Sequence, residues 1–116
     1  MLYGLNNGTR KISATISSVD KELAKAYIQG GVDCFCNNNP LGVFSVQILF
    51  GGDNKNWNGT PLQCLYDNHF YIRKSSEPKK QAASDVGILL REVLSSDKRR
   101  DFEYVREATG HQYRMR

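Results

Sequence analysis

The stretch that decides the fold is SEPKKQAASDVGILLREVL, residues 76–94. Its apolar residues recur every three or four positions, the spacing of one face of an α-helix. Ser76 is a candidate N-cap, and Pro78 suits an early helical position because proline lacks the backbone N–H that the first turn leaves unpaired. The opposite face is assigned Lys79, Lys80, Asp85 and Arg91. The apolar face, which we expect to pack on the rest of the protein, consists of Ala82, Val86, Leu89, Leu90, Val93 and Leu94.

Upstream, residues 9–16 alternate between apolar and polar side chains, which predicts a half-buried strand. Asn7-Gly8 is typical of a tight hairpin turn, so residues 2–5 are expected to pair back as a short edge strand. A helix is predicted over residues 17–30, with a serine cap and acidic residues in its first turn, ending at Gly30-Gly31.

The segment between the two predicted helices favours β-structure. Residues 32–37 and 43–50 are predicted as strands joined by a turn-rich connection, and residues 62–66 and 69–74 as a hairpin around Asp67-Asn68. The strand over 43–50 is expected to lie centrally in the sheet. Its clearest feature is an alternating apolar stripe made of Phe44, Val46, Ile48 and Phe50.

The C-terminal segment, residues 97–116, fits two patterns. Phe102 and Val105 have helical spacing, whereas Phe102 and Tyr104 alternate as in a strand. We favour a helix. The prediction is then a single α+β domain over residues 1–116, with an antiparallel sheet of about four to six strands covered on one face by two or three helices. If the C-terminal segment is a strand, the alternative is a ferredoxin-like arrangement with an inserted hairpin.

The chain has 116 residues, of which 40% are hydrophobic, enough for one modest core. No apolar run approaches the roughly 20 residues that a membrane helix requires, and the N-terminal residues lack the pattern of an export signal. Three cysteines, an odd number, suit reduced thiols better than a disulfide framework. We therefore expect a cytoplasmic protein with no membrane partner.

Cysteine and histidine could in principle supply zinc ligands or a nucleophile. Cys34, Cys36, Cys64 and His69 could approach one another if the predicted strands are neighbours. A C-x-C pair on a strand converges poorly on one ion, so these thiols are expected to be core residues, with no metal and no cofactor. A thiolate beside His69 and Asp67 lacks a recognised nucleophile context, so no catalytic residue is assigned and an enzyme is the third hypothesis.

The leading hypothesis is a non-enzymatic binding protein that acts as a homodimer and recognises a protein or a small ligand. The long loop over residues 51–61 contains the only tryptophan, and loops of that length are often functional. A second candidate surface is the uncovered side of the predicted sheet, which is unusually apolar. The candidate ligand or partner residues are Trp57, Asn54, Asn56, Tyr71, Leu49 and Leu65.

The alternative hypothesis is a nucleic-acid-associated regulator. Residues 1–69 carry five Lys/Arg and five Asp/Glu, whereas residues 70–116 carry eleven and seven, so the net charge of +4 lies in the second half. A localised basic surface is typical of polyanion binding, although acidic residues are interleaved here. The residues assigned to this surface are Lys98, Arg99, Arg100, Arg73 and Lys74.

Overall fold

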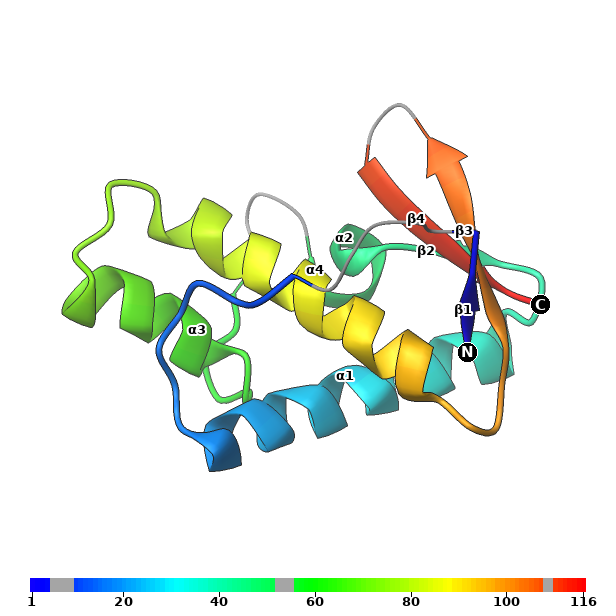
Figure 1. Ribbon diagram of the computed structural model, residues 1–116, viewed down its shortest axis with the longest axis horizontal. Helices are drawn as coiled ribbons and strands as arrows, with labels where there is room; N and C mark the ends of the chain where they lie inside the picture. Colours follow the sequence, from blue (N-terminus) through cyan, green and yellow to red (C-terminus); the bar gives the residue numbers. More distant parts are fainter. Residues whose placement is uncertain (5–9, 52–55, 108–109) are drawn as a thin grey trace.

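The computed structural model describes residues 1–4, 10–51, 56–107 and 110–116 (Figure 1). They form an α+β structure with a four-stranded sheet, as predicted at that level. The elements in chain order are β1 (Leu2–Tyr3), α1 (Ser18–Asn38), β2 (Val43–Phe44), α2 (Val46–Phe50), α3 (Gln63–Asp67), the π-helix η1 (Asn68–Ile72), α4 (Pro78–Ser96), β3 (Phe102–Glu107) and β4 (Gly110–Met115).

The predicted amphipathic helix is confirmed as α4, which runs through the middle of the molecule with α3 near its N-terminal end and the sheet near its C-terminal end (Figure 1). Pro78 is its first residue, and the N-cap is Glu77 in place of Ser76. All six predicted apolar residues are buried. Asp85, which we assigned to the polar face, is buried as well because it binds the N-terminal segment.

Helix α1 is longer than predicted, and the strand expected over residues 32–37 is wrong. The buried residues Ala24, Ile28, Val32 and Cys36 recur every four positions, so the helical face continues to Asn38. Gly31 is no helix stop: a Cβ built there would lie 2.9 Å from the Phe50 ring, and glycine instead permits close packing of α1 on α2.

The β-structure predicted for residues 43–74 is mostly wrong. Only Val43–Phe44 pair in the sheet, because Ser45 caps α2 by accepting a hydrogen bond from the Ile48 amide (3.2 Å). Residues 62–66 and 69–74 contribute to α3 and η1 in place of a hairpin. The Asn68 side chain bonds both backbone groups of Thr15, at 3.0 and 2.7 Å, so a contact distant in sequence replaces the turn.

The strand predicted over residues 9–16 is also wrong in its described part. Residues 10–17 form neither a strand nor a helix and bend at Ser13 and Ala14, although Ala14 is buried and Ile12 is half-buried, as the alternation predicted. Side chains of Asp85 and Asn68 bond this backbone where a neighbouring strand was expected. The Asn7-Gly8 turn lies outside the described residues.

The C-terminal segment is a β-hairpin, so the favoured helix is wrong and the strand alternative is right. Tyr104 pairs with Tyr113 in its register, and the sheet order is β1-β3-β4-β2. β1 is parallel to β3 while the other pairs are antiparallel, which makes the sheet mixed. The element order also differs from the β-α-β-β-α-β order of a ferredoxin-like fold, because two strands follow α4 and one strand lies between α1 and α2.

Aromatic rings connect the sheet to the helices. Phe44 lies 6.1 Å from both Phe102 and Tyr113 and 5.4 Å from Phe35 of α1, measured between ring centroids. Phe44 and Phe102 are completely buried. The short strand β2 is therefore anchored by the side chain that closes this aromatic cluster. In the described residues, no helix has both the length and the apolar composition needed to cross a bilayer.

Candidate functional site

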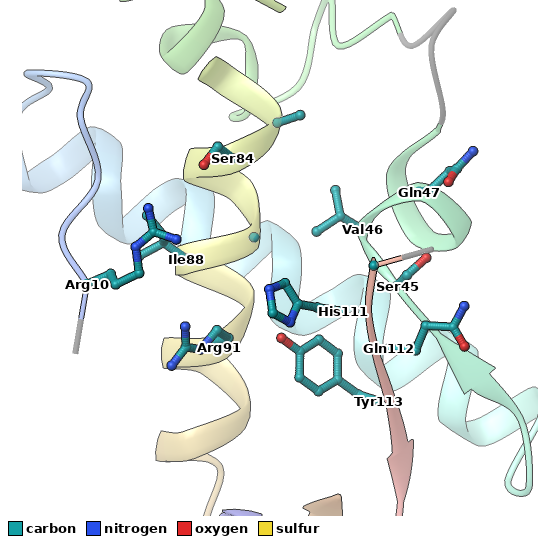
Figure 2. A pocket seen from close by; sticks show the side chains of 13 residues that line it. Arg10, Ser45, Val46, Gln47, Ser84, Ile88, Arg91, His111, Gln112 and Tyr113 are labelled. Atoms are coloured by element: carbon teal, nitrogen blue, oxygen red, sulfur yellow. The ribbon is translucent and has the colours of Figure 1, made fainter. Parts of the chain in front are cut away.

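A pocket of about 340 Å³ lies between α4, α2 and β4 (Figure 2). Its cationic or titratable side chains are Arg10, Arg91, His111 and Tyr113, and no Asp or Glu lies among its described lining residues. Figure 2 shows His111 and Tyr113 pointing from β4 toward α4, while Arg10 approaches from the N-terminal segment. Neutral polar and apolar groups complete the wall, among them Ser45, Gln47, Ser84, Gln112, Val46 and Ile88.

The pocket exists because β2 leaves the sheet early. Ser45 caps α2, and there the chain turns away from β4. Of this segment, only Val43 and Phe44 pair with β4. The amide of Arg116 bonds the carbonyl of Asp101 (2.8 Å), and bonded pairs alternate along an antiparallel ladder. The backbone groups of Tyr113 and His111 therefore face away from β3. On the side away from β3, Phe44 pairs with Tyr113, but β2 ends before it reaches His111, whose partner in the register is Arg106 of β3.

Gly87 keeps the α4 side of the pocket open. A Cβ added there would meet only the Val46 Cγ2 atom, at 3.9 Å, so the glycine is not required by a close backbone contact. Glycine inside a helix costs about 1 kcal/mol relative to alanine. Its consequence for the site is an accessible stretch of helix surface beside Ile88 and Arg91.

Two arginines at this pocket have no counter-charge among the described residues. Neither Arg10 nor Arg91 forms a hydrogen bond or an ion pair with a described residue. A guanidinium offers five N–H donors in a planar fork that matches carboxylate or phosphate oxygens. The half-buried position of Arg91 also shields it from solvent more than an ordinary surface arginine.

Tyr113 supplies a neutral donor to the same pocket. Burial raises the pKa of the Tyr113 phenol to about 12, although the charge of Arg91 acts in the opposite direction. The phenol therefore keeps its proton near neutral pH and can donate a hydrogen bond. Next to it on the same strand face, the exposed His111 has its Nδ1 3.2 Å from the Tyr104 hydroxyl.

The residues predicted around the tryptophan loop have a different arrangement. Trp57 is buried, and its indole N–H donates to the Phe50 carbonyl (2.9 Å), so it packs on the core. Asn56 is exposed and accepts a hydrogen bond from the Asn58 amide. Trp57 and Asn56 do line a second hollow, of about 330 Å³, while Asn54 lies outside the described residues.

The predicted apolar sheet face is wrong because its members lie on helices. Leu49 is half-buried in α2, Leu65 is completely buried in α3, and Tyr71 is exposed on η1. Each faces a different environment, so the structure does not bring the three together as one surface.

The predicted nucleic-acid residues form two separate groups. Arg73 and Lys74 precede α4, and residues 98–100 follow it, so a 19-residue helix, about 28 Å long at 1.5 Å per residue, separates them. Arg99 and Arg100 both bind Asp33, and Arg73 donates to the Ser13 carbonyl (3.1 Å). Much of this charge is therefore engaged within the molecule, while Lys74 and Lys98 are exposed.

A buried polar cluster that the sequence analysis missed lies on the other side of α4. Asp85 accepts hydrogen bonds from the Ser13 and Ala14 amides, at 2.8 and 3.1 Å, and its Oδ2 lies 2.8 Å from His69 Nε2. Arg73 lies 3.1 Å from His69 Nδ1; since arginine can only donate, Nδ1 accepts and Nε2 carries the proton. We call Ser13, Ala14, His69 and Asp85 the Asp85 clasp.

The clasp contains Ser, His and Asp but is not arranged as a catalytic triad. A triad places the serine and the carboxylate on different nitrogens of the histidine. Here Ser13 Oγ (3.4 Å) and Asp85 both approach Nε2 of a fully buried His69. The clasp therefore attaches the N-terminal segment to α4. The sequence signal was available, because Asp85 lies three residues after Ala82 and four before Leu89, within the apolar face.

The cysteines lie on helices. Cys34 is exposed and Cys36 buried on α1, while Cys64 is half-buried on α3, and all three are free thiols. Burial raises the pKa of the Cys36 and Cys64 thiols, which makes them poor nucleophiles near neutral pH. Within the described ranges, no group of three or more His, Cys, Asp or Glu side chains is arranged to hold a metal ion.

No protein-family model matches the sequence, and no significant match was found among curated proteins or among solved structures.

Proposed function

We propose that the protein is a non-enzymatic binding protein whose pocket between α4 and β4 takes a ligand bearing a carboxylate or phosphate group. The observation that carries this proposal is the pair of arginines, Arg10 and Arg91, at a concave site that has no described acidic side chain. In this proposal α4 covers one face of the sheet, as expected from the sequence, and the ligand lies between the helix and the sheet.

The chemistry of the pocket suits binding better than catalysis. Arg91 offers charge and Tyr113 a neutral hydroxyl, and hydrogen bonds involving a charged group contribute about 1.5–3 kcal/mol each. Nucleophilic catalysis would require a hydroxyl or thiol beside a base. Among the described lining residues, neither Ser45 nor Ser84 hydrogen-bonds a histidine, and the Ser45 hydroxyl caps α2.

The test is titration with simple anions, namely inorganic phosphate, acetate and citrate, followed by ¹H–¹⁵N NMR of the backbone amides. Binding at the proposed site moves the signals of residues 87–91 and 110–113 and is weakened in Arg91→Gln. Lys98→Gln is the matched control, because it removes the same charge from an exposed position beyond the end of α4. Equal weakening in both variants, or no shifts with any anion, would refute the proposal.

The homodimer remains part of the proposal, on a different surface from the one first predicted. Val19, Leu23 and Tyr27 lie four residues apart on α1 and are 67%, 52% and 39% exposed. They form an apolar stripe that continues to the half-buried Phe50 of α2, whose ring centroid lies 5.7 Å from that of Tyr27. Contiguous exposed apolar surface of this kind often meets another chain. The free thiols support the expected cytoplasmic location.

Sedimentation equilibrium tests the dimer. The native protein is expected to show concentration-dependent association that Leu23→Asp abolishes, since a carboxylate in an apolar interface loses its hydration without gaining a partner. Glu22→Asp, on a neighbouring exposed position, is the control. A native protein that stays monomeric at high micromolar concentration would remove the homodimer from the proposal and leave the pocket unaffected.

A further inference from the structure

We propose that the ligand of this pocket is the C-terminal end of an extended peptide, which adds to the open edge of β4 and places its carboxylate at Arg91. This inference rests on the proposed function, because it names the class of anion that the same pocket takes. Three features carry it: a strand edge that no described strand covers, a barrier at one end of that edge, and a cation with no partner in the described part of the chain.

The open edge is the side of His111 that faces away from β3. Its backbone N–H and C=O face the side of the sheet that β2 vacates after Phe44, and no described backbone or side-chain group bonds them. Main-chain groups at a strand edge bind extended peptides by adding a strand. A small inorganic anion would use the arginines but would leave the carbonyl of His111 without a donor. A peptide supplies both an N–H and a C=O.

The barrier is the end of β2. Phe44 and Ser45 occupy the continuation of the same edge, because Phe44 already pairs with Tyr113. A peptide that enters beside His111 and runs parallel to β4 therefore meets β2 and has to end there. The pocket volume of about 340 Å³ lies at the small end of the range for ligand sites, roughly 300–1,000 Å³, which suits a few terminal atoms better than a continuing chain.

The charge at that end complements a carboxylate. Arg91 of α4 has no described hydrogen-bond or ion-pair partner, and the Tyr113 hydroxyl points from β4 toward α4 (Figure 2). Val46, Ile88 and Gly87 leave an apolar recess for the last side chain of the peptide. Strand addition gives a bound peptide its affinity and a side-chain pocket gives it specificity, and an arginine fork matches the oxygens of a carboxylate.

The experiment uses N-acetylated tetrapeptides that end in Ala, Val, Leu or Phe, each prepared as the free acid and as the C-terminal amide. Binding to the full chain is followed by NMR and by calorimetry. We expect at least one acid to bind, to shift the His111 amide signal, and to lose about tenfold in affinity as the amide, a factor that corresponds to about 1.4 kcal/mol. Arg91→Gln should remove the difference between acid and amide, whereas Lys98→Gln should preserve it.

Gly87→Leu provides a second variant, which fills the recess without removing a charge. It should abolish peptide binding, while its NMR spectrum remains that of a folded protein.

Three outcomes would overturn the inference. The first is equal binding of acids and amides. The second is tighter binding of an amidated peptide that carries an internal Glu, which would assign the pocket to side-chain carboxylates. In the third, phosphate or citrate binds in an Arg91-dependent manner while no peptide acid does, so the proposed function stands without the inference. If neither anions nor peptides shift the pocket signals, the proposed function itself fails.

Discussion

Helix α4 carries two polar clusters within about two turns of each other, and they differ in whether the charged side chain has hydrogen-bond partners among the described residues. In the Asp85 clasp, the Ser13 and Ala14 amides and the His69 ring donate to the carboxylate, and Asp85 and His69 are almost completely buried. At the pocket, Arg91 is half-buried and has no described hydrogen-bond partner. Satisfied polar groups stabilise a fold, whereas a partly shielded charge without a partner is available to a ligand.

The largest expected effect is on the clasp. Asp85→Ala leaves the Ser13 and Ala14 amides and the His69 ring without their acceptor, and it should lower the free energy of unfolding by roughly 3–5 kcal/mol. Urea denaturation measures the change. Asp85→Asn, which keeps one carbonyl acceptor, should cost less. A loss below about 1 kcal/mol for the alanine variant, the range of an exposed pair, would show that the clasp does not hold the N-terminal segment.

The second expected effect concerns the pocket, where a substitution should lower ligand affinity and leave stability almost unchanged. Arg91→Gln should weaken binding of an anionic ligand by about tenfold or more, because one charge-assisted contact is lost. Its free energy of unfolding should stay within about 0.5 kcal/mol of the native value, as for other surface substitutions. Calorimetric titration and urea denaturation of the same sample separate the two quantities. A large loss of stability would place Arg91 with the clasp, as a structural residue.

The third prediction tests whether Gly87 serves the pocket at the expense of the helix. Gly87→Ala should raise the free energy of unfolding by about 0.5–1 kcal/mol, since alanine is the better helix former and the added Cβ meets only Val46, at 3.9 Å. Ligand affinity should fall modestly at the same time. Gly30→Ala on α1, where nothing lies within 4 Å of a built Cβ, is the matched control for helix propensity alone. Equal stabilisation with unchanged affinity would show that the recess is not used.

The smallest expected effect is a pH dependence of the folding stability, caused by Asp33, which binds the arginines that follow α4. Partial burial raises the pKa of Asp33, but hydrogen bonds from Arg99, Gln29 and Arg100 outweigh it and hold that pKa below its ordinary value of 3.8. A carboxylate with a lowered pKa in the folded state contributes stability above its unfolded pKa and loses it as pH falls through the folded one. Urea midpoints should therefore drop between pH 5 and pH 3, and less so in Asp33→Asn. An identical drop in the variant would assign the acid sensitivity to other groups.

How much the sequence could predict depended on the distance over which each segment finds its partners. In α4, the apolar residues from Ala82 to Leu94 repeat at helical spacing, and Pro78 begins the helix, so local information was sufficient. In residues 43–50, the alternation of Phe44, Val46 and Ile48 fits a strand, yet the Ser45 cap turned the chain into α2. Alternation over a few residues does not distinguish a strand from a short helix whose cap competes for the same backbone.

The candidate site was less predictable than the fold. Arg10, Arg91 and His111 are far apart in the sequence and belong to no motif, and they meet only because the N-terminal segment, α4 and β4 converge. The basic residues 98–100 form the more conspicuous sequence cluster, but Asp33, which lies more than 60 residues away, binds two of them. Charge visible in a sequence does not show which cations already have partners.

The sequence by itself determined the α+β class, the long amphipathic helix and the burial of its apolar face, because helical periodicity and turn chemistry act over a few residues. The tertiary structure alone decided the mixed strand order, the burial of Asp85 and the pocket beside His111. Each of these depends on hydrogen bonds between segments separated by tens of residues, as between Asp85 and Ser13 or between Phe44 and Tyr113. Such bonds form only where the packed helices and strands bring their donors and acceptors together.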